Sequence, residues 1–158
     1  MARSYLVKKR IAVIAVLLAG SVGGLCAPAF ATLGEDISSV QNDQTHLNAS
    51  VRVVAGERYS VQEMQTPTGT TIKEYVSPGG TVFALSWRGF APDLQQLLGS
   101  YFDQYMTAAS QTAHRGRGVR HIDTGDLVVE SGGHMRYVVG RAFLRSKMPS
   151  GVSSDDIR

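Results

Sequence analysis

The stretch "EYVSPGGTVFALSWRGFAPDLQQLLGSYFDQY" (74–105) decides the fold, because it contains the end of a strand, a turn, a second strand and most of a helix. A proline followed by two glycines, in "SPGG", is typical of a tight turn between strands. We therefore expect a hairpin between "TTIKEYVS" (70–77) and "TVFALSW" (81–87). If Val76 pairs with Thr81, one face of this hairpin is almost wholly apolar.

The segment "APDLQQLLGSYFDQYMTAA" (91–109) predicts one amphipathic helix. From Leu94 to Met106 the large apolar residues recur at i, i+3, i+4, i+7, i+8, i+11 and i+12, which makes one continuous stripe. Asp93 and Gln96 have the spacing of a capping box at the start of this helix. A helix with a single apolar stripe packs that stripe against another layer, here the sheet.

Three further segments complete the predicted fold. "ERYSVQEMQT" (57–66) alternates like a strand. "DLVVESGGHMRYVVGRAFLR" (126–145) is typical of a hairpin that turns at Gly132 and Gly133. Apolar residues at helical spacing between positions 35 and 54 predict an amphipathic helix at the N-terminal end of the domain.

The predicted fold class is therefore α+β. We expect an antiparallel sheet of about five strands, with an N-terminal helix and one amphipathic helix between strands 3 and 4. Residues 32–146 would form this single domain, which is an ordinary length for one hydrophobic core. Residues 147–158 are mostly polar and are expected to form a loose tail.

Residues 1–31 have the pattern of a cleaved signal peptide. Basic residues precede the apolar run "IAVIAVLLAG" (11–20), and Ala29 and Ala31 stand at the −3 and −1 positions of a signal-peptidase site. The run is shorter than the about 20 residues of a membrane-spanning helix. A lipoprotein signal at Cys26 is the alternative, but a lipobox has its leucine three positions before the cysteine, and here a leucine directly precedes it. We expect cleavage after Ala31.

Removal of the signal changes the charge balance. The whole chain has 16 Lys+Arg against 13 Asp+Glu, a net charge of +3. Four of the basic residues and none of the acidic ones lie in the signal, so the mature chain has 12 against 13 and a net charge of −1. Overall basicity therefore gives no argument for a nucleic-acid partner. Cys26 is the only cysteine, so the mature chain would contain neither a disulfide nor a thiol nucleophile.

Two blocks of the sequence resemble a known family. "KEYVSPGGTVFALSWRGFAPDLQQLLGSYF" (73–102) and "DLVVESGGHMRYVVGRAFLRSKMPSGV" (126–152) are similar to the domain of unknown function 2844 family, which consists of small exported proteins of Gram-negative bacteria. The resemblance extends from about Leu33 to Val152. It implies a signal peptide, a single domain, and a location in the periplasm or outside the cell. It implies no activity and no catalytic residues.

Three residues are candidates for catalysis: Glu74, Asp93 and His134. In the expected hairpin register Glu74 would lie opposite Phe83 on the apolar face, where desolvation raises the pKa of a carboxyl group and favours acid–base chemistry. The alternatives are a register that differs by one residue, which would place Glu74 on the other face, or a position at a sheet edge where Glu74 reaches water. Asp93 could pair with Glu74, but its position at a helix start already explains it as a cap.

Aromatic residues are the candidates for ligand binding. Trp87, Tyr101 and Tyr105 could stack on a sugar or an aromatic ligand, in a pocket between sheet and helix. Aromatic residues at helical spacing that face a sheet are also typical of a hydrophobic core. The core interpretation is the one that the spacing favours.

The basic segment "HRGRGVRH" (114–121) is too rich in glycine to continue the helix and predicts an exposed loop. Arg115, Arg117 and Arg120 could bind lipid phosphates, cell-wall carboxylates or an acidic protein surface. The alternative is a solvated loop with no partner.

Three classes of function follow. The residues favour a non-catalytic binding or interaction module of the cell envelope, whose partner is another envelope protein or an anionic envelope component. A small-ligand carrier with a pocket between sheet and helix is the first alternative, and a small hydrolase using Glu74 and Asp93 is the second. We expect no cofactor, no nucleic-acid partner and no membrane span after signal cleavage. We also expect no metal, because none of the four histidines has the spacing of a metal site.

Overall fold

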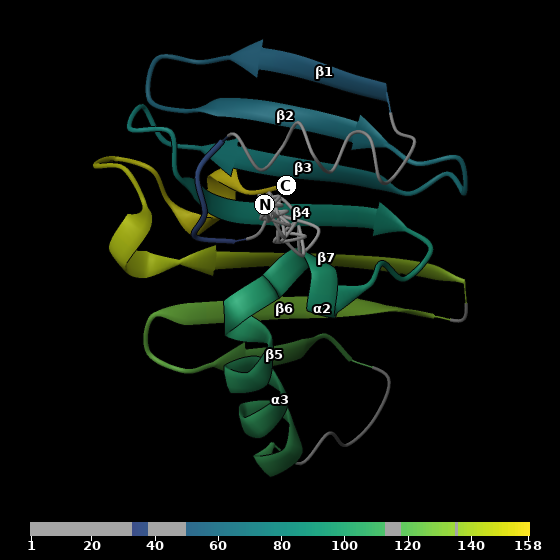
Figure 1. The fold of residues 1–158 in the computed structure, drawn as a ribbon. Coiled ribbons are helices and arrows are strands. Elements are labelled where there is room, and N and C mark those ends of the chain that lie inside the picture. The colour runs from purple at the N-terminus through teal and green to yellow at the C-terminus, as the bar shows by residue number, and fades with distance from the viewer. Residues whose placement is uncertain (1–32, 38–49, 113–117, 135) are drawn as a thin grey trace, which may run out of the picture.

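The computed structural model describes residues 33–37, 50–112, 118–134 and 136–158. Within these ranges the chain forms one antiparallel sheet of seven strands in the order β1-β2-β3-β4-β7-β6-β5 (Figure 1). The strands are β1 (Ser50–Ala55), β2 (Ser60–Gln65), β3 (Thr71–Val76), β4 (Val82–Gly89), β5 (Arg120–Asp123), β6 (Leu127–His134) and β7 (Tyr137–Leu144).

The chain crosses the sheet as two meanders. β1 to β4 are consecutive neighbours, a helical segment follows, and β5 to β7 then return so that β7 pairs with β4. The predicted "SPGG" turn joins β3 to β4. Gly80 in this turn has a φ of 83°, which L side chains rarely adopt, so the turn requires glycine there.

The expectation of a five-stranded sheet with an N-terminal helix is wrong. Positions 50–54, predicted as the end of that helix, belong to β1, and positions 120–121, predicted as loop, begin β5. β-branched residues favour a strand at β1, and its six residue pairs with β2 outweigh the helical spacing of the same valines. Residues 33–37 form turns and an isolated bridge. The remainder of the predicted helix, 38–49, lies outside the described residues.

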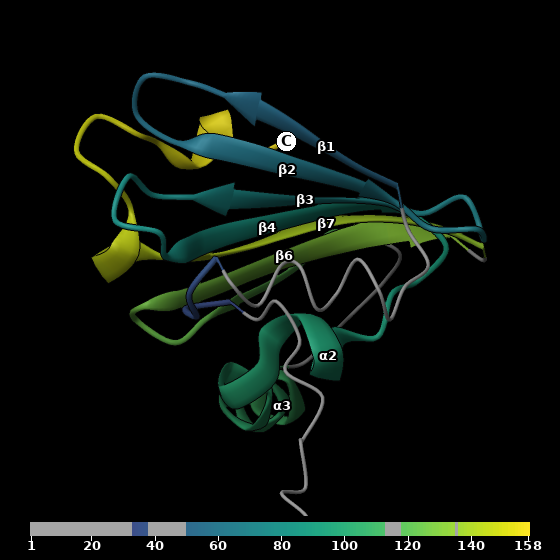
Figure 2. The same cartoon turned by 45° about the horizontal axis from the view of Figure 1, so that its top comes forward.

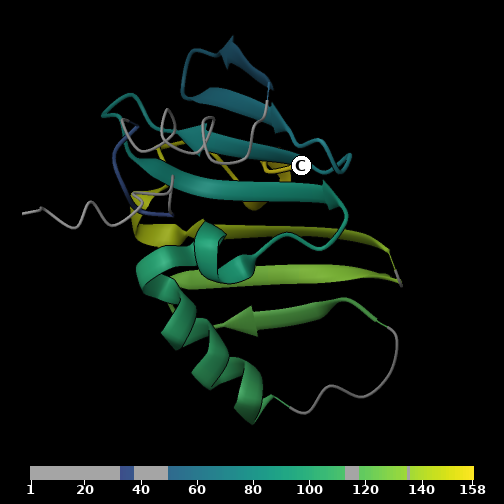
Figure 3. The same cartoon turned by 45° about the vertical axis from the view of Figure 1, so that its right-hand side comes forward.

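The amphipathic helix follows the predicted strand at 81–87, but it lies between β4 and β5 and not between strands 3 and 4 as expected, because β1 precedes the predicted strands, and it is divided. Its parts are α2 (Leu94–Leu98), the 3₁₀ turn η1 (Gly99–Tyr101) and α3 (Phe102–Gln111). Gly99 has φ 48° and ψ −119°, so the α-helical hydrogen bonding is interrupted at this residue. Figure 3 shows that α2 and α3 lie on the same side of the sheet. The helical residues buried there are Leu97, Leu98, Tyr105 and Ala109.

The β3–β4 hairpin has a different register from the expected one. A bulge shifts the pairing, so that Val76 lies opposite Val82 instead of Thr81. Phe83 consequently packs in the core on the face of the sheet opposite to the helices. The sequence pattern did not reveal this bulge, because both faces of β4 are apolar at this end.

The β6–β7 hairpin also forms, but it turns later than expected. Gly132 and Gly133 lie inside β6 and pair with β7, and the strand ends at His134 opposite Tyr137. Gly133 has a φ of 137°, and a Cβ there would come within 2.2 Å of the backbone oxygen of Tyr137. The two glycines therefore permit a close approach of two strands rather than a turn.

The sheet has a core on each face (Figure 2). The larger core lies between the sheet and the helices. Its buried residues are Leu33, Met64, Ile72, Val76, Val82, Leu85, Trp87, Leu97, Leu98, Tyr105, Ala109, Ile122, Leu127, Val129, Ala142 and Leu144. The smaller core lies on the other face and contains Tyr75, Phe83, Ala84, Val128, Phe143 and Ile157.

Residues 145–158, here called the C-terminal strap, cover the smaller core and include the turns η2 (Arg145–Lys147) and η3 (Ser154–Asp156). The expected loose tail instead packs on the sheet, because Ile157 is only 1 % exposed. Tyr75 on β3 donates a hydrogen bond from its hydroxyl to the backbone oxygen of Arg158 and accepts one from its N–H, each at 2.7 Å. The strap covers one half of this sheet face, the half nearer the β3–β4 turn.

Candidate functional site

Glu74 is fully buried in the middle of β3. It lies opposite Leu85 on β4 and Gln62 on β2, on the face of the sheet that packs against the helices. The carboxylate is thus on the apolar face, although its neighbour on β4 is Leu85 and not Phe83. A group without access to solvent cannot meet a substrate unless the covering layer moves, so this position favours a structural role for Glu74.

Asp93 is the N-cap of α2, as the sequence predicted. Its Oδ1 accepts hydrogen bonds from the backbone N–H groups of Gln95 and Gln96, at 2.9 and 3.3 Å. Such a cap stabilises a helix by about 1 kcal/mol. The carboxylate is therefore used in building the helix start.

The catalytic candidates do not come together. Glu74 pairs with Leu85 on β4, Leu85 pairs with Ala142 on β7, and Ala142 pairs with Val129 on β6. Val129 is five positions before the exposed His134. β6 is also three strands away from β3. At about 3.3 Å per residue and about 4.8 Å per strand, Glu74 and His134 are about 20 Å apart. Asp93 follows β4 and caps a helix, so no acid–base pair is assembled from these three residues.

The three aromatic candidates belong to the larger core. Trp87 is 1 % exposed and lies against Gly140, where a Cβ would come within 2.3 Å of the indole Cζ2. Tyr101 lies against Gly34, where a Cβ would come within 2.9 Å of Cε2. Tyr105 is 5 % exposed. These rings pack in the interface between sheet and helix, as the core interpretation of their spacing expects.

The basic loop lies only partly within the described residues, since Arg115 and Arg117 fall outside them. Arg120 is the first residue of β5 and is half-buried. Its Nη2 donates to the backbone oxygen of Ala109 in α3, at 3.4 Å. Arg120 therefore ties β5 to α3 rather than serving as a free surface cation.

The half of the second sheet face that the strap leaves uncovered forms a groove of about 730 Å³. Ile157 and Arg158 of the strap close one end of it. The charged residues that line the groove are Glu63, Lys73, Arg88, Glu130, Arg141 and Arg158. This volume falls within the range of about 300–1,000 Å³ that ligand sites occupy.

One row of polar residues crosses the floor of the groove from strand to strand. The strand register places the row in the order Arg52, Glu63, Lys73, Ser86, Arg141, Glu130 and His121. Opposite charges are neighbours at several places in the row, and such cross-strand pairs stabilise a sheet. The closest approach of Lys73 Nζ to Glu63 Oε2 is 4.0 Å, which is a loose ion pair.

Glu130 holds the tightest ion pairs of this row. Its Oε2 accepts a hydrogen bond from Arg141 Nε at 2.6 Å, and its Oε1 lies 2.9 Å from His121 Nδ1. Burial by itself raises the pKa of Glu130, but the hydrogen bonds from Arg141 and His121 outweigh burial and hold the pKa below its usual value. Arg141 also donates to the backbone oxygen of Ser154, which fastens the strap to the sheet.

Arg88, Arg158 and Lys73 carry the charge that the groove does not neutralise, and Arg158 is exposed and takes part in none of the described ion pairs. Arg88 is exposed, and it takes part in none of the ion pairs found in the described part of the chain. Lys73 has only the loose contact with Glu63. The lining contains four basic and two acidic residues, a net charge of +2.

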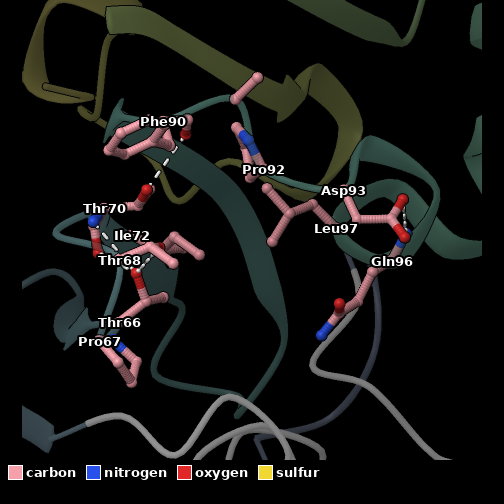
Figure 4. Close-up of a pocket in the computed structure, with 11 residues that line it drawn as sticks. Thr66, Pro67, Thr68, Thr70, Ile72, Phe90, Pro92, Asp93, Gln96 and Leu97 are labelled. Carbon is pink, nitrogen blue, oxygen red and sulfur yellow. Dashed lines mark hydrogen bonds between the residues drawn. The ribbon is translucent and has the colours of Figure 1, made fainter. Parts of the chain in front are cut away.

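A second pocket of about 660 Å³ lies between the β2–β3 turn and the start of α2 (Figure 4). Phe90 and Leu97 contribute apolar walls. The threonine hydroxyls on the opposite wall already have partners in the protein. Thr66 bonds Thr68 within the turn at 2.8 Å, and Thr70 donates to the backbone oxygen of Phe90, just after β4, at 3.1 Å. The aromatic residues predicted to line a carrier pocket are not among its described walls.

Comparison with protein families gives one match, to the family described as "Protein of unknown function (DUF2844)", over residues 29–157. The match covers most of the chain. The chain belongs to this family. The resemblance in the two sequence blocks is therefore confirmed. No curated protein and no solved structure matches the DUF2844 chain.

Two further observations concern the described ranges of this DUF2844 protein. They contain no group of three or more His, Cys, Asp or Glu that could hold a metal ion. No helix in these ranges has the length and apolar character that crossing a membrane requires.

Sequence reasoning missed Lys73 and Arg88. Both alternate with core residues along β3 and β4, so the pattern placed them on the polar face of the hairpin. The pattern could not show that this face continues across β7 and β6 or that the strap covers only half of it. Both facts depend on the strand order.

Proposed function

We propose that this DUF2844 protein is an exported, non-catalytic binding module of the bacterial envelope, which holds its partner in the groove on the second sheet face. The supporting observation is a groove of about 730 Å³ with a net charge of +2 and an exposed, unpaired Arg88. The carboxylates that could have served catalysis have structural positions, since Glu74 is buried and Asp93 caps a helix.

Export is supported by the pattern of residues 1–31. The test is to express the full chain in a Gram-negative host, release the periplasm by osmotic shock and measure the intact mass of the protein. We expect a mature chain that begins at Thr32, in the periplasm or the medium. Full-length protein retained in the cytoplasm would refute export.

Partner binding is tested with the mature chain immobilised and exposed to an envelope extract, followed by mass spectrometry of the bound molecules. Arg88→Gln is the test variant. Arg52→Gln is its matched control, because Arg52 is also exposed on the same face but lies outside the groove lining. We expect one partner that the wild type and Arg52→Gln retain and that Arg88→Gln loses.

The same experiment distinguishes the groove from the basic loop. The double variant Arg115→Ala/Arg117→Ala changes none of the described residues of the groove lining. If this variant loses the partner while Arg88→Gln keeps it, the groove is the wrong site and the loop carries the binding. If no variant changes what is bound, neither surface is the binding site.

A small-ligand carrier is the second candidate, because the pocket beside α2 is largely apolar and of ligand size. Native mass spectrometry of the protein purified from its envelope would detect a molecule that stays bound. Phe90→Ser should release it, whereas Tyr137→Ser, at a similarly exposed aromatic residue outside this pocket, should not. Release by both variants, or no bound molecule, would count against the carrier.

A further inference from the structure

We infer that the groove takes an extended acidic peptide segment, with one carboxylate on Arg88 and another on Lys73. This inference rests on the proposed function and names the class of its partner. It follows from the positions of the two cations, the internal pairing of the other charges and the apolar surface beside Arg88.

The two cations have the spacing of alternate side chains in an extended chain. Lys73 pairs with Ser86, and Arg88 lies two positions further along β4 on the same face. Such diagonal neighbours on adjacent strands are about 7–8 Å apart. In an extended peptide, side chains i and i+2 point to the same side and are about 6.6–6.8 Å apart. Acidic residues at alternate positions can therefore reach both cations.

Three of the other charges in the groove, those of Glu130, Arg141 and Arg158, are held by contacts within the protein, and Arg158 donates from Nε to the backbone oxygen of Asp155 at 2.7 Å. Glu130 is neutralised by Arg141 and His121, and Arg141 also bonds the strap. Arg88 is free of such contacts in the described chain and presents a planar guanidinium, which binds a carboxylate through two parallel hydrogen bonds. The anion is therefore directed to Arg88, with Lys73 as the second contact.

The surface beside Arg88 fits a peptide better than a sugar polymer. Arg88 pairs with Val139, which is 40 % exposed, and Val119 is 70 % exposed at the far wall. Gly132 pairs with Val139, and Val119 packs on Gly132, where a Cβ would come within 3.1 Å of Cγ2 of Val119, so the two valines provide the apolar surface on which a peptide side chain can rest. The one aromatic residue of the described lining, Trp87, is 1 % exposed and provides no ring on which a sugar could stack.

The experiment uses the mature chain and a fluorescein-labelled peptide (Glu-Ser)₃, with binding followed by fluorescence anisotropy at low and at physiological salt. We expect binding that weakens as salt rises. Arg88→Gln should weaken it about tenfold, which is the loss of one charge-assisted hydrogen-bonded pair. Arg52→Gln should change it less than about twofold. Far-UV circular dichroism and unfolding midpoints of the variants check that each retains the fold.

Peptide Glu₃Ser₃ is the matched control, because it has the same charge but its consecutive acids point to alternate sides. It should bind more weakly than (Glu-Ser)₃. Equal binding of the two peptides, or equal weakening by Arg88→Gln and Arg52→Gln, would overturn the inference, since the attraction would then be unspecific. Tighter, Arg88-dependent binding of polygalacturonate or of phosphatidylglycerol vesicles would assign the groove to a polysaccharide or a lipid instead. If the envelope partner depends on Arg88 but no acidic peptide binds, this inference fails while the proposed function stands.

Discussion

Gly140→Ala should destabilise the protein, although alanine is normally the better residue in a strand. Gly140 lies on β7 opposite Trp87. The added Cβ would lie 2.3 Å from Cζ2 and 2.5 Å from Cε2 of the indole, and 2.7 Å from the backbone oxygen of Glu130. Real Cβ atoms essentially never approach within 3.0 Å, so the ring or the strand must move.

The size of the effect follows from two opposing contributions. Replacing a strand glycine by alanine stabilises the fold by about 0.5–1 kcal/mol, because alanine has less conformational freedom to lose from the unfolded chain. Inserting a methyl group into a packed core costs about 1–3 kcal/mol, or more where nothing can yield. Here the contacts are a rigid ring that is 1 % exposed and a backbone oxygen within the sheet, so the cost lies at or above the upper end of that range. We expect a net loss of about 2 kcal/mol in the free energy of unfolding.

Urea unfolding measures this loss directly. Trp87 is the only tryptophan in the chain, so its fluorescence reports the environment that the substitution disturbs. Gly118→Ala is the matched control, because nothing lies within 4 Å of a Cβ built there. A loss below about 0.5 kcal/mol in Gly140→Ala, or an equal loss in Gly118→Ala, would refute the close packing of Trp87 on β7.

Three further substitutions test the cap, the strap and the polar row. Asp93→Ala should lower the free energy of unfolding by about 1 kcal/mol in urea, and no change would mean that the cap is not formed in solution. Ile157→Ala should cost about 2–4 kcal/mol and speed amide exchange across the strap; unaltered exchange would show that the strap does not depend on this side chain. Glu130 has a lowered pKa in the folded state, so its ionisation stabilises the fold above its unfolded pKa, and this contribution disappears as pH falls through the folded pKa. The wild type should therefore lose stability on acidification below about pH 4.5 more steeply than Glu130→Gln, and identical pH profiles would contradict the ion pairs of Glu130.

Elements with a local signal were predictable from the sequence. The apolar stripe from Leu94 to Met106 located the helix, the "SPGG" turn located the β3–β4 hairpin, and the position of Asp93 identified the cap. β1 was not predictable in this way, because its valines fit a helical and a strand pattern equally well. The choice is made by pairing with β2, which is tertiary information.

The groove could not be predicted because it is assembled from distant segments. Its lining comes from five strands of the two meanders and from the strap, and its polar row exists only in the observed register. The strap itself has a polar sequence, and one apolar residue near its end, Ile157, was too weak a signal to predict docking. The bulge beside Tyr75 likewise moved Phe83 to the other face without any local sign.

The pairing of β4 with β7 has a consequence for how the chain reaches its fold. Every other strand pair joins consecutive strands, whereas Ala84 meets Phe143 across 59 positions of the chain. Each meander can form by short-range contacts, but the pairing of β4 with β7 requires the closure of a long loop. Closing a long loop is slow and entropically costly. Until β4 and β7 pair, both strands present long apolar edges with unpaired backbone groups. β4 of one copy of the chain can then pair with β7 of another copy. Folding of the chain therefore competes with strand exchange between neighbouring copies until β4 and β7 have paired.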